Sequence, residues 1–364
     1  MKKMLALLLV LTLVITSFAG CGSSSKEGEK DSKGDALKVV CLLNGNLGDK
    51  SFFDSSKVGM ELVKEQLGCE TKVVEMGFDN TIWESTLYDF CDSDYDVIIV
   101  GTYQMQELLA KVAPQYPDKK FIIYDSEVDA DNVYSITFKQ NEMMYLAGAL
   151  AASLATDPKI TNGSGIISSV YAMDIPVLND FLVGYIQGAK DTDPNIKVAL
   201  SIIGDFSDTA RAKELATAQI NAKSAVVFQC AAQAGLGVID ACKDKGTLAI
   251  GVDADQALAL QKDDPDASKI IVTSAMKNID QAILRAVKMT IDGTCPYGET
   301  EALGMAEKAV GLADNDIYRG IVPQETIDKL DELQTKIQNG EIKVPSAFDM
   351  STDEIKALKD SVAL

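Results

Sequence analysis

Short runs rich in valine and isoleucine recur along the chain from residue 37 onward, and stretches with helical spacing separate them. This alternation is typical of a parallel sheet whose two faces are covered by helices. Segments 51–67 and 208–221 have the spacing of amphipathic helices. The pattern predicts two series of strands, 37–43, 71–77, 95–101, 120–125 and 133–138, followed by 163–170, 197–204, 224–231, 246–253 and 269–276.

The two series resemble each other in the residues that follow their strands. Each series places an aromatic residue, Phe52 or Phe206, beside serine and aspartate residues that can cap a helix. A later strand of each series ends in an aspartate, Asp125 or Asp253. About 330 residues also exceed what a single hydrophobic core usually organises. We therefore predict an α/β fold of two doubly wound parallel-sheet lobes joined by a hinge.

The N-terminal residues predict secretion. A lysine-containing start and the apolar stretch 4–16 form a signal sequence that is too short to span a bilayer. Small residues before Cys21 resemble the lipobox of bacterial lipoproteins, although Phe18 departs from it and a plain secretion signal with an incidental cysteine is the alternative. We expect a signal peptide at 1–20 and a lipid-anchored flexible tether at 21–35, whose composition also suits a disordered terminus without a mechanical role. The expected location is the extracytoplasmic face of the cell membrane.

Composition excludes several classes of function. The net charge of −20 disfavours binding to nucleic acid, whose phosphates it would repel, and it favours solubility. The chain contains no histidine, which excludes imidazole metal sites and Ser-His or Cys-His catalysis. We predict no catalytic residue, metal or cofactor. Six cysteines follow Cys21 without a C-x-x-C pair, and their pairing cannot be deduced, although Cys41 and Cys230 suit buried positions in strands.

Ligands of open α/β sheets bind beyond the carboxyl ends of the strands, so two facing lobes would gather the residues at those ends in one cleft. Phe52 and Phe206 would stack on the two faces of a flat ligand. Phe53 could exchange roles with Phe52, and either aromatic could instead pack into its own lobe.

Charged residues at other strand ends suit a ligand with hydroxyl groups. The carboxylates of Asp125 and Asp253 can accept hydrogen bonds from neighbouring hydroxyls, and Lys277 can balance their charge and donate to a ring oxygen or hydroxyl. A helix cap is the alternative for each aspartate, and a solvated surface position is the alternative for Lys277.

The order and spacing of several motifs resemble the basic membrane protein family of lipoproteins, whose better-known members are purine-nucleoside receptors of ABC importers. The motifs are residues 48–52, 173–176 leading into Phe181 and Gly184, 204–208, 235–239, 251–256, and 273–274 with 277–278. The resemblance implies a type I periplasmic-binding-protein fold. It also implies that Phe52 or Phe53 and Phe206 stack on the base, that Asp125, Asp253 and Lys277 hold the ribose, and that Asn44 reaches the base edge. Three further candidates stand within these motifs, Asp49, Asp174 and Gly235.

The chain departs from the family's pattern at two places that the resemblance assigns to the base. Asn44 stands where the family usually has aspartate, and Phe53 stands where it usually has asparagine. Because an asparagine offers a donor as well as an acceptor, the preferred base can differ while the ribose end is retained.

Lobes of this fold tend to exchange segments at their hinge. We therefore expect 36–155 with about 278–315 to form lobe one, and 156–277 with about 316–364 to form lobe two.

The resemblance implies a monomer that captures a nucleoside, purine nucleosides being favoured, and delivers it to the permease of an ABC importer. A sugar or small-metabolite sensor could use the same fold to signal to a membrane partner. Paired carboxylates also occur in glycoside-cleaving enzymes, but no nucleophile motif or phosphate loop accompanies them here. A soluble transcriptional regulator of this fold would need a basic helix-turn-helix where this chain has a signal sequence.

Overall fold

The computed structural model describes residues 36–364. The predicted signal peptide at 1–20, the tether at 21–35 and the lipidation site Cys21 lie outside the described residues. In the part of the chain that is described, no helix combines the length and the apolar character that crossing a bilayer requires. The predicted ligand-binding residues all fall within 36–364.

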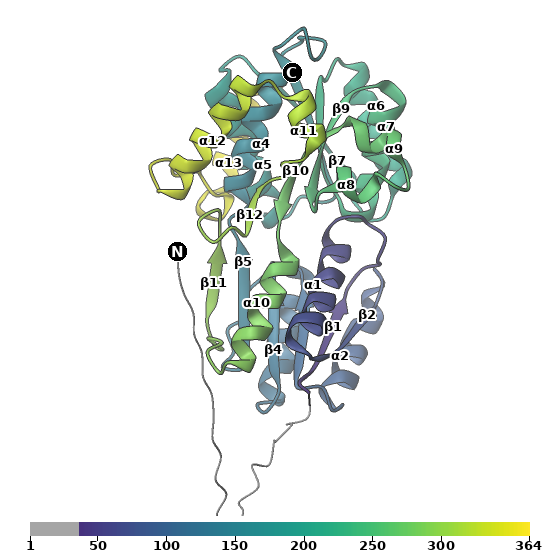
Figure 1. Ribbon diagram of the computed structural model, residues 1–364, viewed down its shortest axis with the longest axis vertical. Coiled ribbons are helices and arrows are strands. Elements are labelled where there is room, and N and C mark those ends of the chain that lie inside the picture. The colour runs from purple at the N-terminus through teal and green to yellow at the C-terminus, as the bar shows by residue number, and fades with distance from the viewer. Residues whose placement is uncertain (1–35) are drawn as a thin grey trace, which may run out of the picture. The chain divides into compact units, whose positions relative to one another are not determined.

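Two six-stranded sheets form the framework of residues 36–364 (Figure 1). The strands of the first sheet are β1 (Lys38–Leu43), β2 (Glu70–Glu75), β3 (Val97–Gly101), β4 (Lys120–Tyr124), β5 (Val133–Phe138) and β11 (Thr300–Leu303). The strands of the second are β6 (Ile166–Tyr171), β7 (Lys197–Ile202), β8 (Val226–Cys230), β9 (Leu248–Asp253), β10 (Ile271–Lys277) and β12 (Val310–Leu312).

The two sheets have the same topology. Their strand orders are β11-β5-β4-β3-β1-β2 and β12-β10-β9-β8-β6-β7, so each strand of one sheet has a counterpart at the same place in the other. The predicted fold of two doubly wound lobes is confirmed. The edge strands differ, because β11 runs parallel to β5 whereas β12 runs antiparallel to β10.

Helices cover both faces of each sheet. Lobe one contains α1 (Phe52–Leu67), α2 (Trp83–Cys91), α3 (Gln106–Val112) and α10 (Ile279–Ile291), with 3-10 turns η1 (Asn80–Ile82), η2 (Tyr103–Met105) and η3 (Ala113–Gln115). Lobe two contains α4 (Gln140–Ala155), α5 (Pro176–Thr192), α6 (Thr209–Asn221), α7 (Gly235–Lys245), α8 (Gln256–Leu260), α9 (Pro265–Ile270), α11 (Asp316–Ile321), α12 (Gln324–Gln338) and α13 (Thr352–Ser361), with η4 (Ala232–Ala234) and η5 (Ala347–Asp349).

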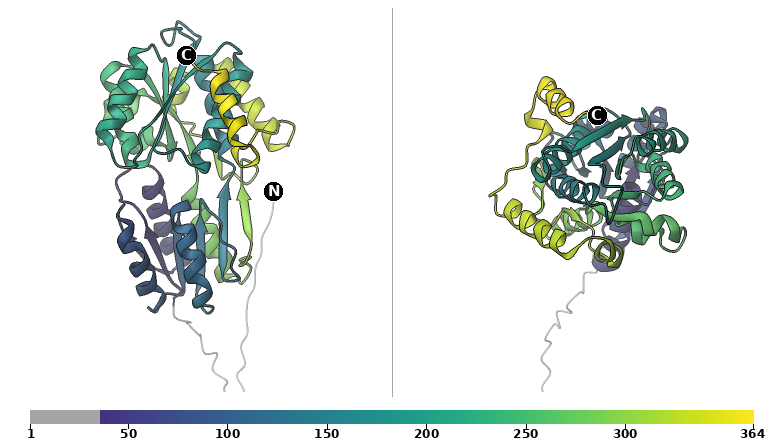
Figure 2. Two further views of the ribbon diagram at one scale, coloured as in Figure 1. Left: turned by 180° about the vertical axis from the view of Figure 1, so that it is seen from behind. Right: turned by 90° about the horizontal axis from the view of Figure 1, so that it is seen from above.

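Alternate residues of the strands in lobe one face two separate cores. Val39 and Cys41 of β1 belong to the core that α1 and α10 cover, and Val40 and Leu42 belong to the core that α2 and α3 cover. Figure 2, which shows the molecule from behind, places the blue helices of lobe one over the second of these faces. This arrangement explains why the central strands are almost continuously apolar.

Aspartate side chains cap the helix that starts with Phe52 and the helix that follows Phe206. The Asp49 carboxylate accepts hydrogen bonds from the backbone N–H groups of Phe53 and Asp54 at 3.0 and 3.1 Å, at the start of α1. The Asp208 carboxylate accepts from the N–H of Arg211 at 2.8 Å, at the start of α6. Such caps satisfy N–H groups that have no partner within the helix.

The chain passes between the lobes at three places within residues 36–364. The first crossing follows Phe138, because α4 packs on α5, β10 and β12 of lobe two. This is earlier than the predicted boundary at residue 155. The chain returns after Lys277 into α10, which packs on α1, and it crosses again between Leu303 and Val310 rather than near residue 315.

Backbone hydrogen bonds tie the crossing segments to one another. The N–H of Lys139 donates to the carbonyl of Leu303, and the N–H of Asn278 donates to the carbonyl of Ala309, both at 2.8 Å. The three segments therefore form a small connected hinge.

Candidate ligand-binding site

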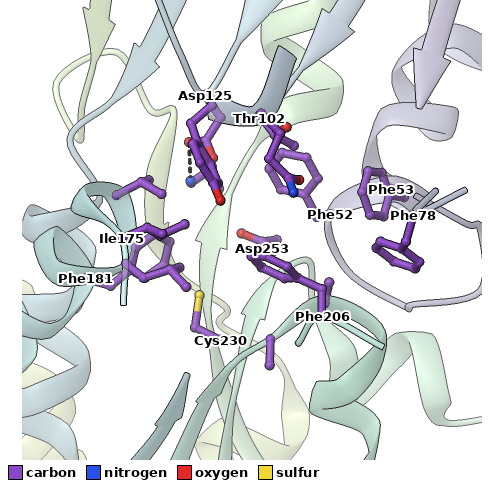
Figure 3. Close-up of a pocket in the computed structure, with 17 residues that line it drawn as sticks. Phe52, Phe53, Phe78, Thr102, Asp125, Ile175, Phe181, Phe206, Cys230 and Asp253 are labelled. Atoms are coloured by element: carbon purple, nitrogen blue, oxygen red, sulfur yellow. Dashed lines mark hydrogen bonds and ion pairs between the residues drawn. The ribbon is translucent and has the colours of Figure 1, made fainter. Parts of the chain in front are cut away.

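A cavity lies between the two lobes, at the carboxyl ends of their parallel strands. Figure 3 shows side chains of both lobes around one space, with Asp125 and Thr102 on one side and Phe206 and Cys230 on the other. The lining residues are Phe52, Phe53, Phe78, Thr102, Tyr103, Gln104 and Asp125 from lobe one, and Ile175, Val177, Leu178, Phe181, Phe206, Cys230, Ala231, Ala232, Asp253 and Lys277 from lobe two.

Two aspartates occupy equivalent places at the ends of equivalent strands. Asp125 directly follows β4, and Asp253 is the last residue of β9. Both have a left-handed backbone, with φ angles of 61° and 63°, a conformation that aspartate adopts more readily than most residues. The two equivalent sequence positions therefore have the same backbone conformation, and each lobe places one carboxylate in the cavity wall.

Lys277 joins the two carboxylates into one charged cluster. Its Nζ lies 2.6 Å from Oδ1 of Asp125, and the two side chains are 2% and 11% exposed (dashed line in Figure 3). Burial alone would lower the pKa of Lys277, but Asp125 and Asp253 raise it above its usual value, so the amine is charged. The rings of Phe181 and Phe138 lie 4.8 and 5.3 Å from the ammonium group, within the range of cation–π attraction.

Asp253 is held by a residue of the opposite lobe. The hydroxyl of Ser51 donates to Oδ2 of Asp253 at 2.8 Å, and both residues are buried. Burial raises the pKa of Asp253 to about 7, against the opposing effects of Lys277 and the Ser51 hydrogen bond. The Asp253 carboxyl therefore titrates near neutral pH while it lines a site that both lobes form.

Aromatic rings surround the remainder of the cavity. The Phe52 and Phe53 rings meet edge to face, with centroids 5.3 Å apart, and the Phe78 ring meets Phe53 in a similar way at 6.1 Å. Phe206 faces them from lobe two (Figure 3). Edge-to-face packing of this kind holds each ring in one orientation, so flat apolar surfaces are presented to a ligand without rearrangement.

The arrangement suits a flat ligand that carries hydroxyl groups. Rings from facing lobes supply apolar contact, and Asp125, Asp253 and Lys277 supply acceptors and a donor for hydroxyls. Of the residues that line the cavity, Cys230 carries the one thiol. Burial raises the pKa of that thiol well above its usual value, so it is neutral and a poor nucleophile.

The sequence matches a known family over most of its length. The profile described as "ABC transporter substrate-binding protein PnrA-like" matches residues 36–347. The chain belongs to this family. Proteins of the PnrA-like family are substrate-binding components of ABC transporters and not enzymes, so a small-molecule ligand and a membrane transporter are the partners that membership implies.

Individual PnrA-like relatives agree with this membership. An uncharacterized lipoprotein of Pyrococcus horikoshii is 28% identical, over 96% of this chain and 94% of the relative. The "ABC transporter nucleoside-binding protein BmpA" of Lactococcus lactis is 30% identical, over 95% of this chain and 99% of the relative. A crystal structure of a solute-binding protein of an ABC transporter system from Aeropyrum pernix superposes with a TM-score of 0.77, at 26% identity, over 90% of this chain and all of that one.

Most of the ligand-binding residues that the sequence analysis predicts at strand ends lie together in the cavity. Phe52, Phe53, Asp125, Phe206, Asp253 and Lys277 all line it. They share a position at or just beyond the carboxyl end of a strand, or at the start of the following helix, which is why the sequence pattern could identify them.

Four other candidates do not line the cavity. Asn44 is 1% exposed and donates to Thr102 and Gln104, which do line it. The Asp49 carboxylate accepts hydrogen bonds from backbone N–H groups at the start of α1, and burial raises its pKa to about 6 although these hydrogen bonds oppose the shift. The exposed Asp174 accepts from Asn179 at 2.8 Å.

Gly235, the fourth of these candidates, is explained by packing. A Cβ at this position would lie 1.9 Å from Oε1 of Gln229, so the absence of a side chain gives the buried Gln229 its space at the start of α7. The motif around Gly235 therefore supports the wall of the site from outside the cavity.

Other residues that line the cavity could not be selected from a sequence pattern. Phe78 comes from the loop after β2, and Thr102 follows β3, a strand end without an obvious polar motif. Phe181 lies on α5 within a motif of the family resemblance, but a phenylalanine in an apolar helix most often belongs to the core. Its contact with Lys277 depends on the tertiary structure.

Proposed function

We propose that this protein is an extracytoplasmic lipoprotein that captures a nucleoside, preferably a purine nucleoside, between its lobes and delivers it to an ABC importer without chemical turnover. The observation that carries the proposal is the pairing of facing aromatics with a buried Asp125–Lys277–Asp253 cluster in one cavity. Membership of a substrate-binding family and a relative named for nucleoside binding support it.

In this proposal the cavity has a base end and a ribose end. Phe206 from one lobe and Phe52 or Phe53 from the other stack on the base, because their rings come from facing sides of the cavity. Asp125, Asp253 and Lys277 hold the ribose hydroxyls. A buried carboxylate discriminates strongly, because a ligand that lacks the hydroxyl leaves the charge without a partner.

A sugar sensor is the second candidate, since the same cluster could hold a pentose. The aromatic and aliphatic side chains that make up most of the lining favour a base. A glycoside-cleaving enzyme is disfavoured for another reason, because the carboxylates are tied to Lys277 and Ser51 rather than free to protonate or attack a substrate.

The first experiment is a binding screen with residues 36–364, which form a compact unit of their own. Thermal shift against nucleosides, free bases and pentoses should show stabilisation by nucleosides, about 2.7 kcal/mol for a ligand at 100 times its Kd. Stabilisation by pentoses alone would favour the sensor. Release of free base in proportion to protein concentration would favour the enzyme.

The ribose end has its own test. Calorimetric titration should show that the parent prefers a ribonucleoside to its 2′- and 3′-deoxy analogues. Asp253→Asn should lose this preference, because an amide cannot accept from two hydroxyls with both of its polar atoms. Full ribose preference in Asp253→Asn would contradict the assignment.

A further inference from the structure

Thr102 has an unusual backbone for its residue type. It follows β3 with a φ of 71° and a ψ of 153°, a conformation that β-branched residues rarely adopt. Its N–H donates to the carbonyl of Tyr124 at 3.0 Å, and its own carbonyl accepts from Met105 at 3.2 Å, so both sides of the strained peptide are fixed. Strain of this kind is concentrated at binding and catalytic sites, and Thr102 lines the cavity.

The Thr102 side chain is oriented by Asn44. The Asn44 amide nitrogen donates one hydrogen to Oγ1 of Thr102 at 2.7 Å and the other to Oε1 of Gln104 at 3.2 Å. The Asn44 oxygen is buried and has no hydrogen-bond partner among residues 36–364. A buried acceptor without a partner is unfavourable, so the contacts to Thr102 and Gln104 are what hold the amide in this orientation.

This orientation determines which hydrogen-bonding groups face a ligand. Because Oγ1 of Thr102 accepts from Asn44, the hydroxyl hydrogen of Thr102 remains to be donated, and it goes to no protein acceptor within residues 36–364. Because Oε1 of Gln104 also accepts from Asn44, the Gln104 amide nitrogen is left as a second donor. This part of the cavity wall therefore offers two donors without another protein partner, while each oxygen keeps one lone pair.

We propose that Thr102, positioned by Asn44, selects the base by donating a hydrogen bond to an acceptor on its edge, and that the site prefers 6-oxopurine nucleosides to those with an amino group or hydrogen at that position. This inference rests on the proposed function. A carbonyl oxygen accepts from the donors of Thr102 and Gln104, whereas a 6-amino group can meet only the remaining lone pair of an oxygen and leaves the amide donor of Gln104 without an acceptor.

Replacing Asn44 by aspartate should change which group the Thr102 hydroxyl donates to. A carboxylate can only accept, so in Asn44→Asp the Thr102 hydroxyl would donate to the new carboxylate and would no longer be available to the base. Asn44→Asp and Thr102→Val should therefore lose the same selectivity by different routes. The double variant should lose no more than either single variant.

The test is calorimetric titration of the parent and these variants with inosine, adenosine and purine riboside, which has hydrogen in place of the 6-oxygen. The parent should bind inosine about 3- to 10-fold more tightly than purine riboside, the range expected for one net hydrogen bond. In Thr102→Val, Asn44→Asp and the double variant the ratio should fall clearly below that of the parent, because only the Gln104 amide then remains as a donor, and binding of purine riboside should be retained. Thr102→Ser keeps the hydroxyl and should keep the ratio.

The outcomes separate this inference from the function on which it rests. If no nucleoside binds the parent, the proposed function fails and this inference fails with it. If nucleosides bind but Thr102→Val keeps the parent's ratio of inosine to purine riboside, nucleoside capture stands and the role of Thr102 is wrong. If Thr102→Val loses the ratio and Asn44→Asp keeps it, the positioning by Asn44 is wrong.

Discussion

At the scale of single residues, Phe206 offers the most direct test of the base end. It faces the Phe52 and Phe53 rings across the cavity and belongs to the opposite lobe (Figure 3). Phe206→Ala removes apolar area that every base would use, so it should weaken all nucleosides by about 1–3 kcal/mol.

The measurement is calorimetric titration against purine and pyrimidine nucleosides. Phe348→Ala is the matched control, because Phe348 is 60% exposed and lies outside this cavity. Binding of every nucleoside by Phe206→Ala at the parent's affinity would show that the ring does not stack.

Asp253 should make the stability of the protein depend on pH. Its pKa is about 7 in the folded protein because it is buried, and near 4 in an unfolded chain. Between these values the folded state binds the additional proton, so this group contributes stability at low pH that is lost as the pH rises through 7. Relative to Asp253→Asn, the parent should therefore become less stable between pH 5 and pH 8.

Denaturation midpoints of both proteins across this range provide the test. Asp125, Asp49, Lys277 and Cys230 also influence the Asp253 carboxyl, and all four remain in the variant. Asp263→Asn is the control, because Lys50 lowers the pKa of that exposed carboxyl. The difference in stability between Asp263→Asn and the parent should therefore stay constant over these pH values. A flat difference for Asp253→Asn as well would mean that the carboxylate is already ionised at pH 5.

The residues that the sequence identified differ physically from those that it missed. Phe206 and Asp253 could be found because strand ends of parallel sheets converge and the two lobes repeat the same pattern. Asn44 has the same kind of position, yet its side chain is covered by Thr102 and Gln104, which only the packing between strands decides. A residue's position at the end of a strand predicts that it lies near the cavity, but it does not predict whether its side chain lines the cavity or is covered by a neighbour.

At the scale of elements, the strands could be predicted because β-branched runs between helical stretches leave few alternatives. The edge strands β11 and β12 were missed, since four and three residues are too few to show a pattern. The lobe to which α4 belongs was also missed. This helix is apolar on nearly all sides, so its sequence does not show which sheet it covers.

Contact between α4 and α5 explains where α4 lies. A Cβ on Gly188 of α5 would lie 1.9 Å from the backbone carbonyl of Tyr145 in α4. The two helices can approach this closely only where a side chain is absent. The small residues of both helices therefore fix α4 to lobe two, although it follows the last long strand of lobe one in sequence.

We predict that Gly188→Ala destabilises the protein by about 1–3 kcal/mol or more, because the helix backbones must move apart. Gly320→Ala in α11 is the matched control. It also adds a methyl group to a helix, but nothing lies within 4 Å of the new atom, so it should be neutral or slightly stabilising. Urea denaturation measures both, and equal stability of the two variants would contradict the close contact.

At the scale of the whole described chain, residues 36–364 have polar contacts between lobes on the cavity side and three crossing segments at the hinge. Ser51 of lobe one donates to Asp253 of lobe two inside the cavity. Lys50, its neighbour, forms an ion pair with Asp263 of lobe two at 3.0 Å, where solvent screens it. These contacts lie on the side of the molecule that must open to admit a ligand.

We expect the Ser51–Asp253 hydrogen bond to favour the closed arrangement of the ligand-free protein. It is buried and its acceptor is a carboxylate, so its loss in Ser51→Ala should shift the equilibrium toward open forms by about 1.5–3 kcal/mol. The ligand should close the variant again, because Phe52 and Phe206 contact it together only when the lobes approach.

Small-angle X-ray scattering should then give Ser51→Ala a larger radius of gyration than the parent without nucleoside, and the same radius at saturation. Asp263→Asn, which removes only the solvent-screened ion pair, should scatter as the parent does. Equal radii for Ser51→Ala and the parent without ligand would mean that this hydrogen bond does not set the resting arrangement of the lobes, and that the hinge or the buried Asp125–Lys277 ion pair between the lobes does.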